Sequence, residues 1–313
     1  MSAAPDAGGP DLSVGFAGIQ LKNPVIAASG TFAYGVEFED IVHLGRLGGI
    51  VVKGLSREPM AGNPPPRLYE TAAGMLNAIG LQNIGARVFI EEKLPKLRAM
   101  KDVVVIANIF GFTRADYEIA IEILNEGEGI AAYELNVSCP NTAHGGIQFG
   151  CDPRLLDEVV NAACRVSQRP LIVKLSPNVT SIAHMARIAE EAGADAISLV
   201  NTFMATAIDA ETRKPRIANV TAGLSGPAIK PIALRMVYDA SKAVKIPVIG
   251  MGGISTPADI AEFMLAGATA VEIGTASFWD PVATEKIAGE LERWCADHDI
   301  FRISELTGGM LMD

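Results

Sequence analysis

Eight short apolar runs, rich in β-branched residues, alternate with helical patterns along the whole chain. The runs are 25–28, 49–53, 103–109, 132–137, 171–175, 196–200, 247–251 and 270–274. The stretches between them, such as 181–193 and 257–267, carry apolar residues at helical spacing and end in glycine. Continuous apolar strands followed by helices predict parallel strands that are covered on both faces. Eight such units in 313 residues fit a (β/α)8 TIM barrel better than a doubly wound sheet.

The segment before the first run predicts a small addition to this barrel. Residues 12–23 alternate between apolar and polar side chains, which is typical of a short N-terminal β-hairpin. No internal repeat or low-complexity linker divides the rest. We therefore predict a flexible N-terminus over 1–11 and a single barrel domain over 12–313.

Composition and charge exclude several classes of protein. The formal net charge of −10 argues against nucleic acid or an anionic membrane surface as a partner. No apolar run reaches the roughly 18 residues that a membrane span needs, and the first residues lack the features of a signal peptide. The four cysteines show no C-x-x-C spacing, so neither a disulfide scaffold nor a metal site is indicated. We expect a cytoplasmic protein.

Polar side chains gather at the ends of consecutive runs. They are Lys53, Asn108, Asn136, Lys174, Asn201 and Thr202. Chemistry in such barrels gathers at the C-terminal ends of the strands, so these groups should converge on one mouth. A buried ammonium needs an anion or an acceptor, although a single lysine at a strand end could also reach water by itself. Two lysines inside apolar runs, together with three asparagines, favour a binding site.

The last two units indicate a phosphate site. Short glycine-containing turns, "GMGGIS" and "GTAS", follow the seventh and eighth runs, where barrels often bind phosphate. After the first turn, Thr256, Pro257 and Asp259 form a capping-box pattern at a helix start. The glycines could be turn residues and nothing more, but their paired position favours a phosphate-bearing ligand.

Two kinds of ligand fit these parts. A flavin mononucleotide (FMN) would place its phosphate in the glycine turns and its ring at the apolar mouth, with Lys174 beside the N1/C2 edge. In a barrel aldolase or lyase, Lys174 would instead form a Schiff base with a phosphorylated substrate. The fold alone leaves both possibilities open.

Several longer motifs carry a resemblance that bears on this choice. They are "NPPPRLYETAAGMLNAIGLQN" (63–83), "NVSCPNT" (136–142), "VKLSPN" (173–178), "NT" (201–202), "GLSGPAIKP" (223–231) and "GMGGI" (250–254). With them, the chain from about Leu12 to its end resembles the class 1 dihydroorotate dehydrogenases. The resemblance implies an FMN-containing (β/α)8 barrel that oxidises dihydroorotate to orotate in pyrimidine synthesis.

The resemblance also implies a role for each matching position. Cys139 would be the base that takes a proton from C5 of dihydroorotate, while C6 delivers hydride to flavin N5. The substrate would be held by Lys53, Asn77, Ala78, Ile79, Gly80, Leu81, Asn136, Asn201 and Thr202. FMN would be held by Ser29, Lys53, Gly54, Asn108, Asn136, Lys174, Val200, Gly226, Gly252, Gly253, Gly274 and Thr275. The remaining cysteines, Cys151, Cys164 and Cys295, are interpreted as structural.

Within class 1, the sequences of residues 63–83 and of "GGIQFGCDP" (145–153) resemble those of the NAD-linked branch, class 1B. That branch pairs with an electron-transfer subunit carrying FAD and a [2Fe–2S] cluster, and it implies a heterotetramer of two catalytic and two electron-transfer chains. The chain itself shows no iron–sulfur cysteine set and no dinucleotide fingerprint, in keeping with such a partner. The alternative is the homodimeric class 1A branch, which reduces fumarate.

Overall fold

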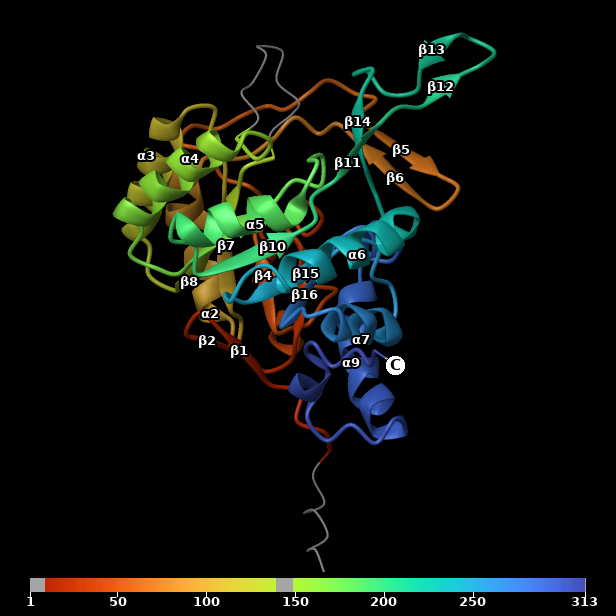
Figure 1. Cartoon of the computed structure of the whole chain (residues 1–313). Helices are drawn as coiled ribbons and strands as arrows, with labels where there is room; N and C mark the ends of the chain where they lie inside the picture. Colours follow the sequence, from red (N-terminus) through yellow and green to blue (C-terminus); the bar gives the residue numbers. More distant parts are fainter. Residues whose placement is uncertain (1–8, 139–148, 313) are drawn as a thin grey trace, which may run out of the picture.

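Eight parallel strands close into a barrel within residues 9–138 and 149–312, which are the residues that the computed structural model describes (Figure 1). The strands are β3 (Val25–Ala27), β4 (Gly49–Val51), β7 (Val105–Ile109), β8 (Ile130–Asn136), β9 (Leu171–Lys174), β10 (Ala196–Leu199), β15 (Val248–Met251) and β16 (Ala270–Ile273). Each pairs in parallel with the next barrel strand along the chain, and β16 returns to β3. The predicted barrel is confirmed, with each of the eight runs supplying one strand.

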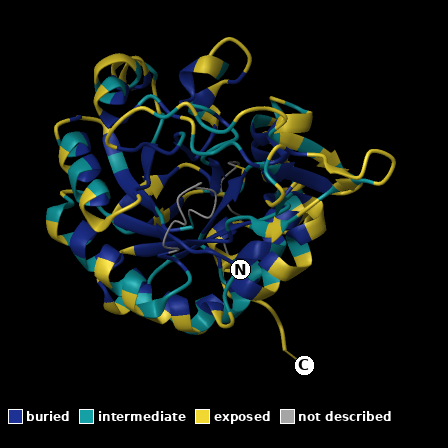
Figure 2. Ribbon diagram, turned by 90° about the horizontal axis from the view of Figure 1, so that it is seen from above, coloured by how far each residue is buried: buried dark blue, intermediate teal, exposed yellow. Residues whose placement is uncertain are grey.

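Helices surround the barrel and leave their polar faces in water (Figure 2). They are α1 (Ala86–Val88), the π-helical turn η3 (Phe89–Lys93), α2 (Leu94–Ala99), α3 (Arg114–Asn125), α4 (Pro153–Val166), α5 (Ile182–Glu191), α6 (Lys230–Ser241), α7 (Pro257–Leu265), α8 (Ala276–Trp279) and α9 (Ala283–Asp297). Short 3-10 turns lie at η1 (Val36–Phe38), η2 (Leu44–Arg46), η4 (Pro227–Ile229) and η5 (Ile303–Leu306). The core lies between these helices and the strands, whose residues are almost all buried.

Local chemistry explains where the predicted helices start and stop. The Ser181 hydroxyl accepts a hydrogen bond from the His184 amide at the start of α5. Thr256 and Asp259 form the predicted capping box at the start of α7. After each helix comes a glycine with positive φ, Gly193 at 103° and Gly267 at 115°, a conformation that other residues rarely adopt.

The predicted N-terminal hairpin is also present. Strands β1 (Val14–Phe16) and β2 (Ile19–Leu21) pair antiparallel and bury alternate side chains against the core. Since β3 begins shortly after β2 ends, the hairpin lies at the N-terminal end of the barrel, low in Figure 1. The backbone of Asp11 forms an isolated parallel β-bridge with Arg302. Residues 1–8 of the predicted flexible N-terminus lie outside the described residues.

A second sheet that the sequence analysis did not predict lies at the opposite, C-terminal end. In the described part of the chain it has four antiparallel strands in the order β11 (Phe203–Ala205), β14 (Ala222–Ser225), β6 (Gly74–Asn77) and β5 (Leu68–Thr71). Its strands come from insertions after β4 and after β10, and a small hairpin of β12 (Ile208–Asp209) and β13 (Lys214–Pro215) projects from it (Figure 1). We call this sheet the roof, because it lies over the mouth of the barrel.

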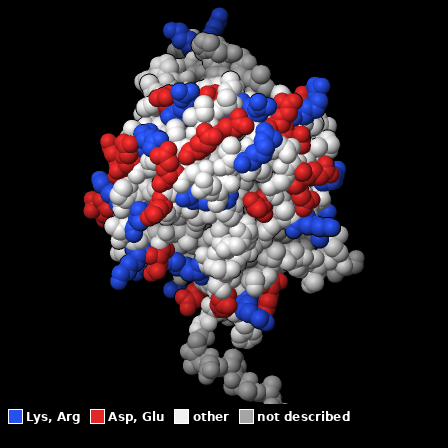
Figure 3. Space-filling view, turned by 90° about the vertical axis from the view of Figure 1, so that its left-hand side faces the viewer, with Lys and Arg blue, Asp and Glu red and all other residues white. Residues whose placement is uncertain are grey.

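The outer surface near α3 and α4 is mixed in charge (Figure 3). Acidic and basic side chains alternate there, and several form ion pairs, such as Arg87 with Glu126 and Arg98 with Glu128. Across the described residues, none of the helices has both the length and the apolar character needed to cross a bilayer.

Candidate active site

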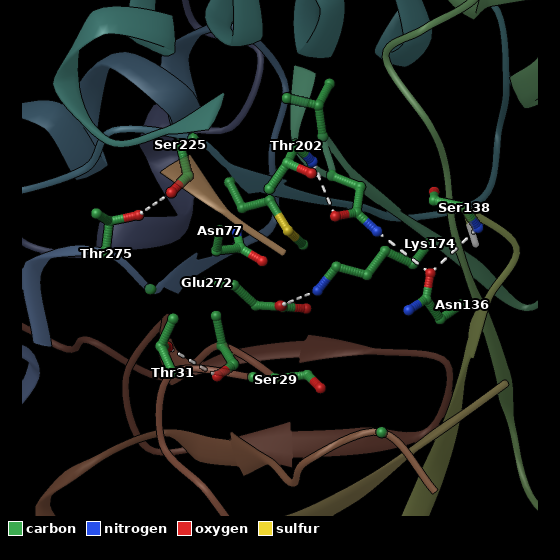
Figure 4. A pocket seen from close by; sticks show the side chains of 18 of the residues that line it. Ser29, Thr31, Asn77, Asn136, Ser138, Lys174, Thr202, Ser225, Glu272 and Thr275 are labelled. Carbon is green, nitrogen blue, oxygen red and sulfur yellow. Dashed lines mark hydrogen bonds and ion pairs between the residues drawn. The ribbon is translucent and has the colours of Figure 1, made fainter. Parts of the chain in front are cut away.

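A cavity of about 220 Å³ lies between the C-terminal ends of the barrel strands and the roof (Figure 4). Most of the residues predicted from the sequence line it. They are Ser29, Lys53, Gly54, Asn77, Ile79, Gly80, Leu81, Asn108, Asn136, Lys174, Val200, Asn201, Thr202, Gly226, Gly252, Gly253, Gly274 and Thr275. Segments from both insertions and from the ends of all eight barrel strands therefore converge here, as the barrel architecture predicts.

Two predicted residues stand apart from this set. Ala78 is fully buried beside the cavity rather than in its lining, and its backbone bonds to Arg67 and Asn63. Cys139, the predicted base, lies outside the described residues, so its role stays a prediction. The neighbouring Ser138 does line the cavity.

Other lining residues were not predicted from the sequence. They are Ala28, Gly30, Thr31, Ser138, Ser225, Ile229, Met251, Glu272 and Phe278. Of these, Glu272 is the most informative, because it is a buried carboxyl inside the apolar run "AVEIG".

Lys174 lies at the centre of a buried polar cluster. Its Nζ lies 3.0 Å from Glu272 Oε2 and 3.2 Å from Glu134 Oε1. Glu134 also accepts hydrogen bonds from Asn108 Nδ2 at 2.6 Å and from Ser198 Oγ at 2.8 Å. The lysine of the fifth run therefore meets two carboxyl groups, which satisfies the requirement for a partner that its burial imposes.

The cluster sets the protonation of its members. Burial opposes the charge on Lys174, but the carboxyl groups of Glu134 and Glu272 outweigh it and raise the pKa of the lysine to about 12. An amine that stays protonated is a poor nucleophile for Schiff-base formation. The geometry thus disfavours the lyase interpretation and favours Lys174 as a fixed positive charge.

Lys53, which follows β4 and also lines the cavity, is in a different environment. Burial, and then the positive charge of Arg67, lower the pKa of its ammonium group. Across the described residues, no carboxylate oxygen lies within 4.0 Å of Lys53 Nζ. A half-buried cation in a cavity, with no anion of its own there, is suited to binding an anionic ligand.

The side-chain amides of Asn136, at the end of β8, and Asn201, after β10, are hydrogen-bonded to each other in the cavity lining. Asn201 Nδ2 donates to Asn136 Oδ1 at 3.2 Å, and the Ser138 backbone N–H donates to the same oxygen at 3.1 Å. The Thr202 backbone N–H in turn donates to Asn201 Oδ1 at 2.8 Å. These bonds fix which amide edge each asparagine turns to a ligand, and an amide offers both a donor and an acceptor.

Glycines build the wall below the roof. Gly226, Gly252 and Gly253 have φ of 95°, 129° and 81°, which favour glycine. A Cβ at Gly252 would lie 2.6 Å from the Ala233 side chain, and one at Gly253 would lie 2.7 Å from the Gly226 carbonyl oxygen. Larger residues would clash, so the backbone itself lines this end of the cavity, as phosphate-binding loops require.

One carboxylate organises the turn after β15, which carries Gly252 and Gly253. Asp259 Oδ2 accepts from the backbone N–H of Ser255 at 2.8 Å and of Thr256 at 2.9 Å. Its other oxygen pairs with Lys230, which also lies 2.9 Å from Glu262. On the far side, Thr275 Oγ1 donates to Ser225 Oγ at 2.8 Å and joins the eighth turn to the roof.

Comparison with known proteins places the chain among proteins of one family. The family model described as "Dihydroorotate dehydrogenase" matches residues 11–294. A protein of Solibacter usitatus, provisionally named dihydroorotate dehydrogenase A (fumarate), is 62% identical over 96% of this chain and 98% of its own length. Proteins of Geobacter sulfurreducens and Geobacter sp. strain M21, each named dihydroorotate dehydrogenase B (NAD(+)), catalytic subunit, are 55% and 54% identical over the same shares.

Proposed function

This chain belongs to the dihydroorotate dehydrogenase family, and from that premise we propose that it oxidises (S)-dihydroorotate to orotate in pyrimidine synthesis with FMN as cofactor. One observation carries the proposal. Two lysines of opposite character, one fixed in a carboxyl cluster and one without an anion among the described residues, share a cavity with a row of amides. Such a set of side chains is suited to binding the flavin ring of FMN next to dihydroorotate, a pyrimidine that carries a carboxylate.

The residues of the cavity fit FMN. Three buried polar atoms, Asn108 Oδ1, Ser138 Oγ and Glu272 Oε1, have no hydrogen-bond partner in the described part of the chain, and all three residues line the cavity. Buried polar atoms of this kind are rare and indicate a place for a polar ligand. The glycine wall at Gly252 and Gly253 suits the phosphate.

When bound, FMN would supply the acceptor for the hydride of the substrate. The protonated Lys174 would hold a positive charge beside the N1/C2 edge, where negative charge develops. Backbone groups of the glycine turns would hold the phosphate. In this arrangement the protein orients the ring and stabilises charge, while the roof covers the cavity and excludes water.

The substrate would lie in the same cavity, against the flavin ring. Lys53 would pair with the carboxylate, which explains why a half-buried ammonium is kept there without a carboxylate of its own among the described residues. Asn77, Asn136 and Asn201 would meet the ring carbonyl and N–H groups. Cys139, which follows the lining residue Ser138 in the sequence, would take the C5 proton as a thiolate.

Electrons would leave through a partner. We infer a class 1B, NAD-linked enzyme because relatives named as NAD(+) catalytic subunits align over nearly the full chain. The partner would be an electron-transfer subunit with FAD and a [2Fe–2S] cluster, in a heterotetramer of two catalytic and two electron-transfer chains. The fumarate-type name of the relative at 62% identity supports the class 1A alternative, a homodimer that reduces fumarate. The cytoplasmic location predicted from the sequence stays a prediction.

An anaerobic titration of the purified chain with dihydroorotate tests the proposal. We expect the yellow flavin absorbance to bleach and one orotate to form for each flavin. Flavin that binds without bleaching would contradict the substrate, and a chain that fails to bind FMN would contradict the cofactor. Reoxidation separates the subclasses, because fumarate alone restores colour in class 1A, whereas class 1B requires NAD⁺ and the partner subunit.

A further inference from the structure

Three ionisable side chains meet in the barrel interior with almost no contact with water. Glu134, Lys174 and Glu272 are exposed by 0%, 5% and 1%. One ammonium can balance only one carboxylate. If both glutamates were ionised, this wall of the cavity would carry a net negative charge in a region of low dielectric, which is costly.

The two glutamates are not equivalent. Glu134 receives hydrogen bonds from Asn108, Ser198 and Lys174, and donors of this kind favour the ionised form of a carboxyl group. Glu272 receives a bond from Lys174 at Oε2, while its Oε1 has no partner among the described residues. The hydrogen-bond pattern therefore assigns the negative charge to Glu134.

We propose that Glu272 is kept as a neutral carboxylic acid, so that the cluster holds one shared proton and the cavity wall carries no net charge. Its proton can be donated to Glu134 or into the cavity. Burial, and then the charge of Glu134, raise the pKa of Glu272 well above its usual value, in agreement with this assignment. Glu272 is thus a positioning residue, which leaves the charge of Lys174 available to a ligand.

The surroundings of Glu272 add no further charge. On β16 it lies opposite Ile26 of β3 and Met251 of β15, which are both apolar. Among the described residues, the charged groups that act on it are Glu134 of β8 and Lys174 of β9. The protonation of Glu272 is therefore decided inside the cluster, and the pair of glutamates titrates as a unit.

The role of the acid rests on the proposed function. A cofactor that gains negative charge on reduction would be stabilised by Lys174 and repelled by a second carboxylate in the same wall. A neutral Glu272 removes that repulsion. Loss of its proton at high pH would leave the cluster with a net charge of −1 and oppose reduction.

Infrared spectroscopy of the purified full chain tests whether the two glutamates share one proton, which the hydrogen-bond pattern assigns to Glu272. Near neutral pH we expect the carbonyl-stretch band of one buried protonated carboxylic acid. Glu272→Gln should remove the band, and so should Glu134→Gln, because Glu272 must then ionise to balance Lys174. The matched control is Glu262→Gln on α7, which changes a partly exposed glutamate outside the cluster and should leave the band in place.

Three results would overturn the proposal. They are a wild-type spectrum without the band, a band that survives Glu272→Gln, and a band that survives Glu134→Gln. If the buried variants fail to fold, the wild-type spectrum decides alone, since it must show the band or the proposal is wrong.

The role of the acid has a separate readout. The reduction potential of the bound flavin should fall more steeply with rising pH in the wild type than in Glu272→Gln, which has no proton to lose. Identical profiles would refute the role. A chain that shows the infrared band but binds no FMN would contradict the proposed function and leave the neutral acid standing.

Discussion

Asn201 and Asn136 join the ends of two barrel strands through a hydrogen bond of 3.2 Å between Asn201 Nδ2 and Asn136 Oδ1. Asn136 is the last residue of β8, and Asn201 follows β10. Between these strands lies β9, with Lys174 at its end. The amide pair therefore bridges the strand that carries the fixed positive charge, and it couples the orientation of two groups that face the cavity.

Breaking this pair should weaken substrate binding. Asn201→Ala removes the bond to Asn136 and the bond that Asn201 Oδ1 accepts from Thr202. The two lost hydrogen bonds, at about 1 kcal/mol each, should raise KM for dihydroorotate about thirtyfold, with a smaller change in kcat. Steady-state kinetics measures both. Asn161→Ala is the control, because Asn161 bonds within the outer helix α4, and equal kinetics of the two variants would contradict the prediction.

Cys139, which lies outside the described residues, should be needed for proton removal. Cys139→Ala should slow reduction of the flavin by dihydroorotate by about 10²- to 10⁴-fold, which is the usual contribution of a positioned base. FMN should stay bound, since no contact with the cofactor is assigned to the thiol. Rapid-mixing absorbance measures the rate. In the control Cys164→Ala, on α4, the flavin should be reduced at the wild-type rate. If Cys139→Ala also shows the wild-type rate, Cys139 is not the base.

The carboxylate of Asp259 should matter for the phosphate of FMN and not for its ring. Asp259→Asn weakens the bonds to Ser255 and Thr256 that shape the turn after β15, so FMN affinity should fall about tenfold. Riboflavin, which has no phosphate, should bind with unchanged affinity. Fluorescence titration of the apoprotein gives both constants.

Glu262→Gln is the matched control for this prediction. Glu262 also pairs with Lys230, at 2.9 Å, but no hydrogen bond from it to the turn is found among the described residues. Glu262→Gln should therefore leave the affinities for FMN and for riboflavin unchanged. An equal loss of FMN and riboflavin affinity in Asp259→Asn would show that the phosphate is held elsewhere.

The lowered pKa of Lys53 predicts opposite effects of pH on binding and on folding. Burial places the pKa of the folded state below the ordinary value of 10.5. As pH rises through this lowered pKa, the ammonium is lost and affinity for the carboxylate of orotate should fall. Between the lowered pKa and 10.5 the unfolded chain binds more protons, so this group makes the free energy of unfolding rise with pH.

Orotate titrations and denaturant unfolding over that pH range measure the two trends. In Lys53→Met the orotate affinity should be weak and independent of pH. The rise of the free energy of unfolding with pH that Lys53 causes should also disappear. If wild-type affinity stays constant up to pH 10.5, Lys53 is not the group that binds the carboxylate.

The barrel could be predicted because its signal is local. Each strand is a continuous apolar run, and each helix between carries its own caps, such as Thr256 with Asp259. The roof carries no such signal. Its strands are short and partly exposed, and Asn77 bonds to Gly223 across a separation of 146 residues, which local sequence cannot reveal.

The candidate site was predicted in part for the same reason. Polar residues at strand ends, such as Lys53 and Asn136, could be found from their position, whereas Glu134 and Glu272 were missed. Both are carboxyl groups inside apolar runs, "AYELNV" and "AVEIG". A buried carboxyl group needs a partner just as a buried lysine does, so glutamates inside apolar runs are a sequence signal for the partners of Lys174.

The roof has a consequence for how this enzyme could diverge. Its central strands, β6 and β14, pair with each other although they belong to different insertions. Exchange of one insertion alone for that of another barrel would strip its partner of hydrogen bonds. A change in the segment that carries Asn77 therefore requires a matching change in the segment that carries Ser225. Glu134, Lys174 and Glu272 belong instead to the barrel strands β8, β9 and β16, so a change in the roof leaves this charged cluster in place.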